Sequence, residues 1–280
     1  MIIRDEYAMS VPTSLAARVQ RCISDGEIEI PVLDAVALRV YREARSGELD
    51  AEGICDLLKR DPVLVGEVLR LANSGIFGGL VEVRSLRHAV VRLGTRQLSV
   101  LALSAGCKRL YSASGSRFRY RLHKLWRHMS SVGNGAYWLA LHSEHRALAD
   151  DVFVAGLLHD VGKLLVLRAL EDMSERDGTN PTEREIDEVL AAVHCAQGAW
   201  LLERWGLPEM FLELVYRFED EPPAMTDIAL CLVRYVDRVC ALEGIGDEHD
   251  PSIELDSLPA SALFVLSDDA RKQLIDVLRA

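Results

Sequence analysis

The 280-residue sequence predicts an all-α fold, a helical bundle divided into two lobes. Apolar residues recur with helical spacing in most segments, and the alternation typical of strands is nearly absent. Serine, threonine or aspartate precedes several of these segments at the position of an N-cap. The connections are short, which favours helices packed side by side. A chain of this length can form the core of one large domain or of two modest lobes.

The first half of the chain contains four predicted helices, at residues 33–40, 62–72, 85–94 and 95–105. Asp61 is a predicted N-cap, because Pro62 stands at the first helical position, where proline needs no N–H partner. Gly94 is expected to end the third helix, and Thr95 can cap the fourth at once. These segments make up the predicted N-terminal lobe.

The small, polar run 112–116 is the predicted boundary between the lobes. After it, helices are expected at residues 122–141, 151–161, 183–205, 226–242 and 268–278. Residues 172–182 are expected to form a polar loop, and 219–223 a break. We therefore divide the chain into an N-terminal extension (1–23), an N-terminal helical lobe (24–111), a second helical lobe (117–243) and a C-terminal loop and helix (244–280).

Charge and cysteine content limit the classes of partner and compartment. The formal net charge of -11 argues against non-specific binding to nucleic acid or to an anionic membrane, because both are polyanions. The six cysteines are scattered singly without a CxxC pair, as expected for reduced thiols in a cytosol. The first residues lack the pattern of a secretory signal, and no apolar run is long enough to span a bilayer. We expect a soluble, cytoplasmic protein.

The sharpest local signal for chemistry is the run from Gly156 to Lys163, with His159 and Asp160 at its centre. An imidazole and a carboxylate near a helix end can flank one divalent ion. Gly162 can end the helix there and open space, and Lys163 could face a phosphate. In the alternative interpretation, His159 caps or packs against the helix and Asp160 pairs with a neighbouring cation.

Two further polar residues lie on the flanks of predicted helices, at the edge of their apolar arcs: His128 and Asp237. With His159 and Asp160 they form a mixed nitrogen and oxygen set, which suits iron, manganese or zinc better than calcium. His194 and Glu219 are candidate additional ligands. The alternative is a buried polar network satisfied by hydrogen bonds, without a metal.

The order of these residues matches the H…HD…D pattern of the HD superfamily of metal-dependent phosphohydrolases. The N-terminal runs 30–38, 61–74 and 85–94 and the later run 194–208 resemble HDOD domains, the HD-related output domains of bacterial signalling proteins. The resemblance extends over roughly residues 29–240. It implies a fold in which an HD-like helical lobe follows an N-terminal helical lobe.

The resemblance also implies that the chain acts through protein contacts, since HDOD domains are regarded as relatives of cyclic di-GMP phosphodiesterases without established hydrolase activity. Related domains often carry a His-His pair after the position of Pro208, where this sequence has Phe218 and Glu219. Phe218 cannot bind a metal, and the GYP signature of the phosphodiesterase branch is missing. Both departures argue against a dinuclear site of the kind that clamps attacking and leaving oxygens.

From the sequence we therefore expect a bacterial signalling output module that binds other signalling proteins, needs no cofactor and shows no appreciable phosphodiesterase turnover. The alternative is a metal-dependent phosphohydrolase acting on a nucleotide or cyclic dinucleotide. In that case the site would hold iron, manganese or zinc, Asp160 would orient the attacking water, and Lys163 would offset the charge of the phosphate.

Overall fold

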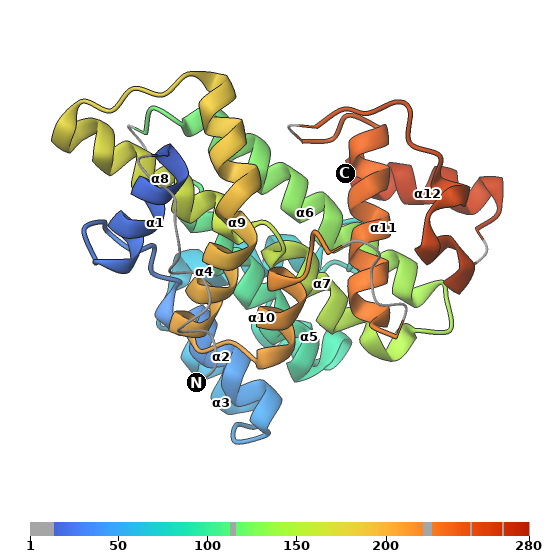
Figure 1. Cartoon of the computed structure of the whole chain (residues 1–280). Coiled ribbons are helices and arrows are strands. Elements are labelled where there is room, and N and C mark those ends of the chain that lie inside the picture. Colours follow the sequence, from blue (N-terminus) through green and yellow to red (C-terminus); the bar gives the residue numbers. More distant parts are fainter. Residues whose placement is uncertain (1–13, 113–115, 221–225, 247, 265, 280) are drawn as a thin grey trace.

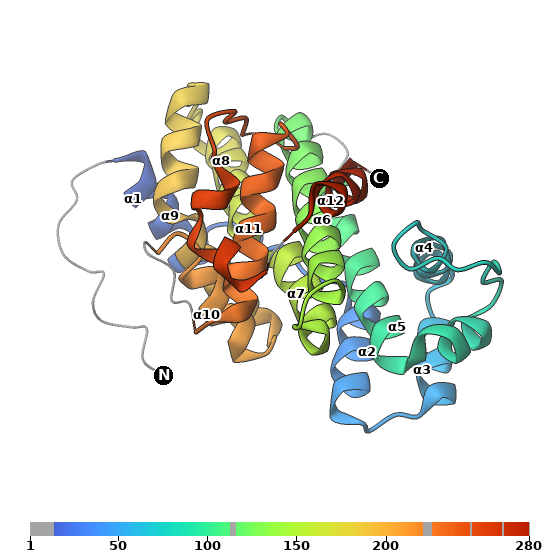
Figure 2. The ribbon, with the colours of Figure 1, turned by 90° about the vertical axis from the view of Figure 1, so that its right-hand side faces the viewer.

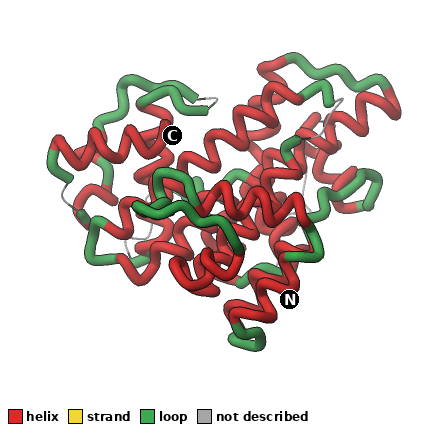
Figure 3. The backbone as a smooth tube through the Cα atoms, turned by 180° about the vertical axis from the view of Figure 1, so that it is seen from behind, coloured by secondary structure: helices red, strands yellow, loops and turns green. Residues whose placement is uncertain are grey.

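The computed structural model describes residues 14–112, 116–220, 226–246, 248–264 and 266–279, and every regular element in these ranges is a helix (Figure 1, Figure 3). The predicted all-α class is confirmed. None of the described helices is long and apolar enough to cross a membrane. Residues 1–13 of the expected extension and 113–115 of the expected boundary lie outside the described residues.

The N-terminal lobe consists of four helices, with the last at its centre (Figure 2). They are α2 (Ala35–Ser46), α3 (Ala51–Leu58), α4 (Pro62–Ala72) and α5 (Leu86–Leu110), and the first three all pack against α5. The side chain of Asp61 accepts a hydrogen bond from the Leu64 amide, as predicted for the N-cap of α4. The Arg109 guanidinium, near the end of α5, pairs with Asp61 and with the α2 cap Asp34. Arg109 thus connects the end of α5 to the starts of α2 and α4 through two ion pairs.

Gly94 interrupts α5, as its position in the sequence predicted. Its backbone has φ 79 and ψ 169, so the element is two helical segments joined at a kink. Glycine is needed there because a side chain is strained at positive φ. The first segment starts after the N-cap Ser85, whose hydroxyl accepts from the His88 amide.

The second lobe contains the longest uninterrupted helices. It comprises α6 (Arg119–Leu141), the short 3-10 turn η1 (Arg146–Leu148), α7 (Ala149–Leu158), α8 (Val161–Asp177), α9 (Glu183–Trp205), α10 (Glu209–Tyr216) and α11 (Ile228–Leu242). α6 packs against α7 and α11, and α9 packs against α8 and α10. The bounds of α9 equal the predicted ones. At its start, Thr182 and Glu185 form a capping box.

Pairs of glycines let helices of this lobe cross at close range. A Cβ on Gly156 of α7 would lie 2.6 Å from the Cα of Gly133 in α6. A Cβ on Gly162 of α8 would lie 1.8 Å from the carbonyl oxygen of His194 in α9. The expectation that Gly162 ends a helix is therefore wrong, because it is the second residue of α8 and serves the contact with α9.

Other predicted boundaries also need correction. The helix expected over 151–161 ends at Leu158, which leaves His159 and Asp160 in the junction between α7 and α8. The loop expected over 172–182 is helical as far as Asp177, because α8 continues until Gly178 takes up a left-handed conformation. Helix α8, with 17 residues, was not predicted, and neither were the short helices α3 and α10, with eight residues each.

Both ends of the described chain pack onto the second lobe. Helix α1 (Leu15–Ser24), also not predicted, lies against α8 and α9. At the other end, the 3-10 turns η2 (Leu255–Ser257) and η3 (Pro259–Leu263) lead to α12 (Asp268–Arg279), which packs against α6. The predicted cap Ser267 accepts from the Ala270 amide, and Leu274 and Leu278 are buried.

The first turn of α7 joins the two lobes. The Asp151 carboxylate is buried there and pairs with Arg45 of α2 at 2.5 Å and with Arg96 of α5 at 3.1 Å. The last residue of the same helix leads directly into His159 and Asp160. Helix α7 therefore runs from the contact with the N-terminal lobe to the candidate site.

Candidate metal centre

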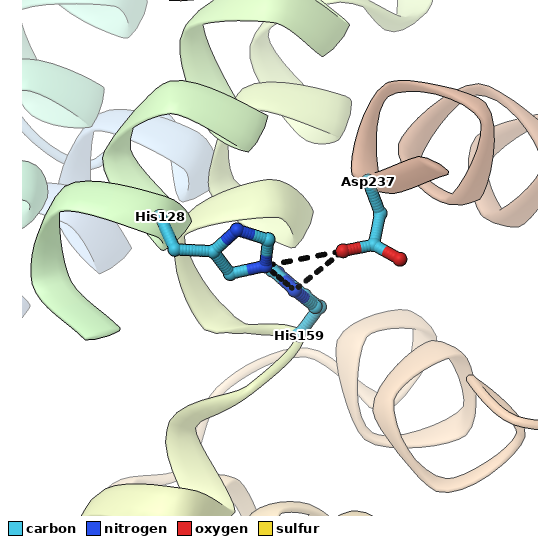
Figure 4. Close-up of side chains that lie close together, drawn as sticks. All are labelled: His128, His159 and Asp237. Atoms are coloured by element: carbon cyan, nitrogen blue, oxygen red, sulfur yellow. Dashed lines mark hydrogen bonds and ion pairs between the residues drawn. The ribbon is translucent and has the colours of Figure 1, made fainter. Parts of the chain in front are cut away.

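Three different parts of the second lobe bring His128, His159 and Asp237 together (Figure 4). His128 is in α6, His159 follows α7, and Asp237 is in α11. The Nε2 atoms of the two histidines are 3.2 Å apart, and Oδ1 of Asp237 lies 3.1 Å from His128 Nε2 and 3.8 Å from His159 Nε2. Residues 109 positions apart in the sequence thus point their ligand atoms at one place.

The Asp160 carboxylate lies beside this cluster and faces two sides. Its Oδ2 is 3.5 Å from His159 Nε2 and 3.8 Å from His128 Nε2, and it accepts a 2.7 Å hydrogen bond from Lys163 Nζ. Its Oδ1 is 3.5 Å from Nε2 of His194. All four predicted ligands therefore meet, and the Lys163 ammonium is bound to Asp160.

Each imidazole is oriented by a backbone carbonyl at its other nitrogen. Nδ1 of His128 is 3.1 Å from the Ile245 oxygen, and the corresponding distances are 2.8 Å from His159 to Gly156 and 2.8 Å from His194 to Leu190. Since a carbonyl oxygen only accepts, each Nδ1 carries the proton in these contacts. That tautomer leaves Nε2 to bind a metal, the arrangement found around histidine ligands generally.

Burial and neighbouring charges shift the pKa values of the cluster in different directions. Burial lowers the pKa of His128, but its hydrogen bonds with Asp237 and Cys240 outweigh this and raise the pKa well above its ordinary value. The pKa of His159 is lowered by burial. Burial alone would raise the pKa of Asp160, yet the Lys163 ammonium and the neighbouring imidazoles hold it far below its usual range.

The donor set fits a divalent transition metal. Ligands about 2.1 Å from a common ion and at tetrahedral angles are about 3.4 Å from each other, and the three distances of the cluster range from 3.1 to 3.8 Å. Without an ion, the one N–H that His128 can offer at Nε2 faces two acceptors, His159 Nε2 and Asp237 Oδ1. A divalent ion would satisfy all three groups at once, and nitrogen with carboxylate suits iron, manganese or zinc.

The two positions that depart from the family pattern differ in their surroundings. Phe218 is buried and its ring centroid lies 4.7 Å from that of His159, so it packs against the cluster as an apolar wall. The Glu219 side chain is half exposed, and its Oε1 is 3.9 Å from His194 Nε2. His194 and Glu219 thus lie on the far side of Asp160 from the three-residue cluster.

An open cleft of about 660 Å³ borders the cluster, and His128, Asp160 and Asp237 line it, whereas His159 is buried. Three cationic side chains, Lys163, Arg121 and Arg238, also line the cleft, together with further carboxylates. Arg121 pairs with Glu183 and Asp187, and Lys163 with Asp160. Arg238 forms no ion pair with any residue that the structure describes, but after the hydrogen bonds from Ser252 its charge also helps to lower the pKa of Asp250.

Sequence reasoning did not identify Arg238 or the Ile245 carbonyl as parts of the site. Arg238 is adjacent to Asp237, and its position at the edge of an apolar arc was a usable signal. A backbone carbonyl leaves no such signal, because every residue has one.

Comparison with known proteins assigns a family to most of the chain. A family model of the HDOD domain matches residues 30–221. An uncharacterized protein of Treponema pallidum (strain Nichols) is 30% identical over 217 residues, which is 75% of this chain and 40% of that protein. The chain therefore spans less than half of the length of this relative.

Solved structures share the fold at low sequence identity. An HDOD domain protein of unknown function from Geobacter sulfurreducens is 22% identical, with a TM-score of 0.73 over 94% of this chain and 93% of its own. A proposed metal-dependent phosphohydrolase from Shewanella amazonensis SB2B is 20% identical, with a TM-score of 0.77 over 95% of this chain and 96% of its own. A proposed signal transduction protein from Marinobacter aquaeolei VT8 is 19% identical, with a TM-score of 0.58 over 97% of this chain and 60% of its own.

Proposed function

Because the chain belongs to the HDOD family, we propose that it is a signal-transduction protein whose HD-like lobe binds one divalent metal ion and hydrolyses a phosphoester. The observation that carries this proposal is the set of oriented ligands, of which His128 and Asp237 line an open cleft and His159 is buried behind them. Structural metal sites are generally closed by four protein ligands, whereas catalytic ones keep a position open to substrate. The open side favours chemistry over a purely structural ion.

One ion is sufficient for this chemistry, so the absence of the His-His pair weighs only against a dinuclear centre. His128, His159 and Asp237 would hold the ion, which would supply a Lewis acid that lowers the pKa of water toward neutrality. Asp160, kept ionised by Lys163, lies where it could orient that water by accepting a hydrogen bond from it. Phe218 keeps solvent from one face of His159.

One cation in the cleft supports a phosphate-bearing substrate, although carboxylates outnumber cations in its lining. Arg238 can pair with a phosphate oxygen, because it lines the cleft and forms no ion pair with the described residues. Guanidinium groups bind phosphate through two parallel hydrogen bonds. A nucleotide or a cyclic dinucleotide is the substrate class that we propose, and a cleft of about 660 Å³ is in the usual range for small-molecule sites.

The test is turnover with added Mn²⁺ on bis(p-nitrophenyl) phosphate, nucleoside monophosphates and cyclic dinucleotides. We expect activity in the wild-type protein and its loss in His159→Ala. The matched control is His123→Ala on α6, whose side chain is exposed and is not among the residues that line the cleft. Activity that persists in His159→Ala, or no turnover by metal-loaded protein, would rule the hydrolase out.

The second candidate is the interaction module without catalysis, with other signalling proteins as partners. The specific observation that favours it is Phe218, which fills a family ligand position with ordinary apolar packing. Under this candidate, the double variant His159→Ala, Asp160→Ala keeps partner binding in pull-downs as long as it stays folded. Loss of binding in a folded double variant would contradict it.

A further inference from the structure

We propose that the turn after α11, residues 243–246, is a working part of the metal centre, because the Ile245 carbonyl orients His128 and Gly246 allows it to approach. This inference rests on the proposed metal-binding function. The turn lies beyond the residues that the family model matches, 30–221, as does the ligand Asp237.

His128 differs from the other two imidazoles in the origin of its acceptor. His159 and His194 use carbonyls three and four residues earlier in the chain, Gly156 and Leu190. The acceptor of His128 is Ile245, which is 117 residues away in the sequence. Its orientation therefore depends on a separate segment being held in place, while theirs depends only on the local helix.

The end of α11 holds that segment. The Ile245 amide donates a 2.8 Å hydrogen bond to the Cys240 carbonyl, and Gly244, with φ 63, precedes it. This is the pattern of a Schellman motif, in which a left-handed glycine turns the chain back on the last helical turn. The Ile245 side chain is buried, which fixes the motif further. Helix α11 thus contributes the ligand Asp237 and, through its C-terminal turn, the carbonyl that orients a second ligand.

Gly246 is the closest point of contact. It has φ 123, and a Cβ there would lie 2.9 Å from His128 Nδ1, 3.0 Å from its Cβ and 3.1 Å from its Cγ. Contacts that short require the imidazole to move, and the imidazole is the ligand. Any other residue at position 246 should therefore displace His128 from Asp237 and His159.

The experiment compares Gly246→Ala with Gly178→Ala by titrating Zn²⁺ against a chelating indicator. Both glycines have positive φ, so both variants carry backbone strain, but a Cβ at Gly178, which caps the end of α8, has no atom within 4 Å. We expect Gly246→Ala to lower the affinity for Zn²⁺ about 10- to 100-fold, the usual effect of losing a group that orients a ligand. Gly178→Ala should stay within about threefold. Equal affinities of two folded variants would overturn the proposal.

A second measurement needs no metal and no variant. In a long-range ¹H–¹⁵N spectrum of the metal-free wild type, Nδ1 of His128 should carry a proton, because it donates to Ile245. An unprotonated Nδ1 would overturn the proposal even if Gly246→Ala does not fold. Wild-type protein that binds no Zn²⁺ would contradict the proposed metal-binding function, whereas an unprotonated Nδ1 would contradict the orienting contact alone.

Discussion

Replacing Gly162 with alanine should destabilise the protein by acting on the crossing of α8 and α9. The added Cβ would lie 1.8 Å from the carbonyl oxygen of His194 and 2.6 Å from the amide nitrogen of Gly198. Both are backbone atoms within a long helix, so neither can rotate away. The two helices must separate, or Gly162 must leave its helical position.

The expected magnitude follows from two opposing effects. Alanine in place of glycine favours a helix by about 1 kcal/mol. Overpacking a core by a methyl group costs about 1–3 kcal/mol, and more when the obstacle is backbone. Because both obstacles are backbone atoms, we take the upper end of this cost and expect a net loss of about 2 kcal/mol in the free energy of unfolding. Each kcal/mol corresponds to about 2–4 °C in Tm in a protein of this size.

Gly66 provides the matched control, because it is also inside a helix but has no atom within 4 Å of its added Cβ. Gly66→Ala should raise the free energy of unfolding by about 0.5–1 kcal/mol. Urea unfolding at neutral pH measures both variants on one scale. If Gly162→Ala is as stable as Gly66→Ala, the close crossing of α8 and α9 is wrong.

Three further predictions concern charged groups. Arg109 lowers the pKa of Asp61 from 3.8 to about 2, so Asp61 stabilises the fold above its ordinary pKa, and this contribution is lost as the pH falls from about 4 to 2. Asp61→Asn should lower the free energy of unfolding by about 1–2 kcal/mol at pH 7 and should have almost no effect near pH 2. In the control Asp50→Asn, at a cap without an ion pair among described residues, the free energy of unfolding measured in urea should change little at either pH. Asp151→Asn should lower the free energy of unfolding by about 1–3 kcal/mol, because it leaves the guanidinium groups of Arg45 and Arg96 without this buried carboxylate. An unchanged midpoint of urea unfolding would contradict the contact between the two lobes. Because the pKa of His128 is raised in the free protein, Mn²⁺ should displace its Nε2 proton on binding. Calorimetry in buffers of different ionisation enthalpy should detect about one proton released per ion near neutral pH. Binding of Mn²⁺ without proton release would contradict the assigned protonation.

Local rules predicted the parts of the fold that depend on neighbouring residues. The N-cap at Asp61, the start of a helix near Ser85 and the interruption at Gly94 could each be predicted from a few residues. Gly162 could not, because the same residue serves equally well to end a helix or to let another helix approach. Only the tertiary contact with His194 distinguishes the two roles.

The grouping of the four side chains could be predicted, whereas their binding of a metal stays a prediction. His128 and Asp237 were selected as polar residues at the edges of apolar arcs, and the family resemblance grouped them with His159 and Asp160. The structure brings the four side chains close together. The carbonyl of Ile245 could not be found, because its contact with His128 joins residues 117 positions apart and involves no characteristic side chain. Which role the site serves, hydrolysis or partner binding, depends on whether an ion is held there.

The most direct test of the central claim is the metal content of the protein after incubation with Mn²⁺ and exhaustive dialysis, measured by elemental analysis. The ligand set predicts one ion per chain in the wild type and in His123→Ala, and none in His159→Ala, since that variant lacks an imidazole 3.2 Å from the other histidine ligand. A wild-type protein without metal, or a His159→Ala variant that retains a full complement, would contradict the account.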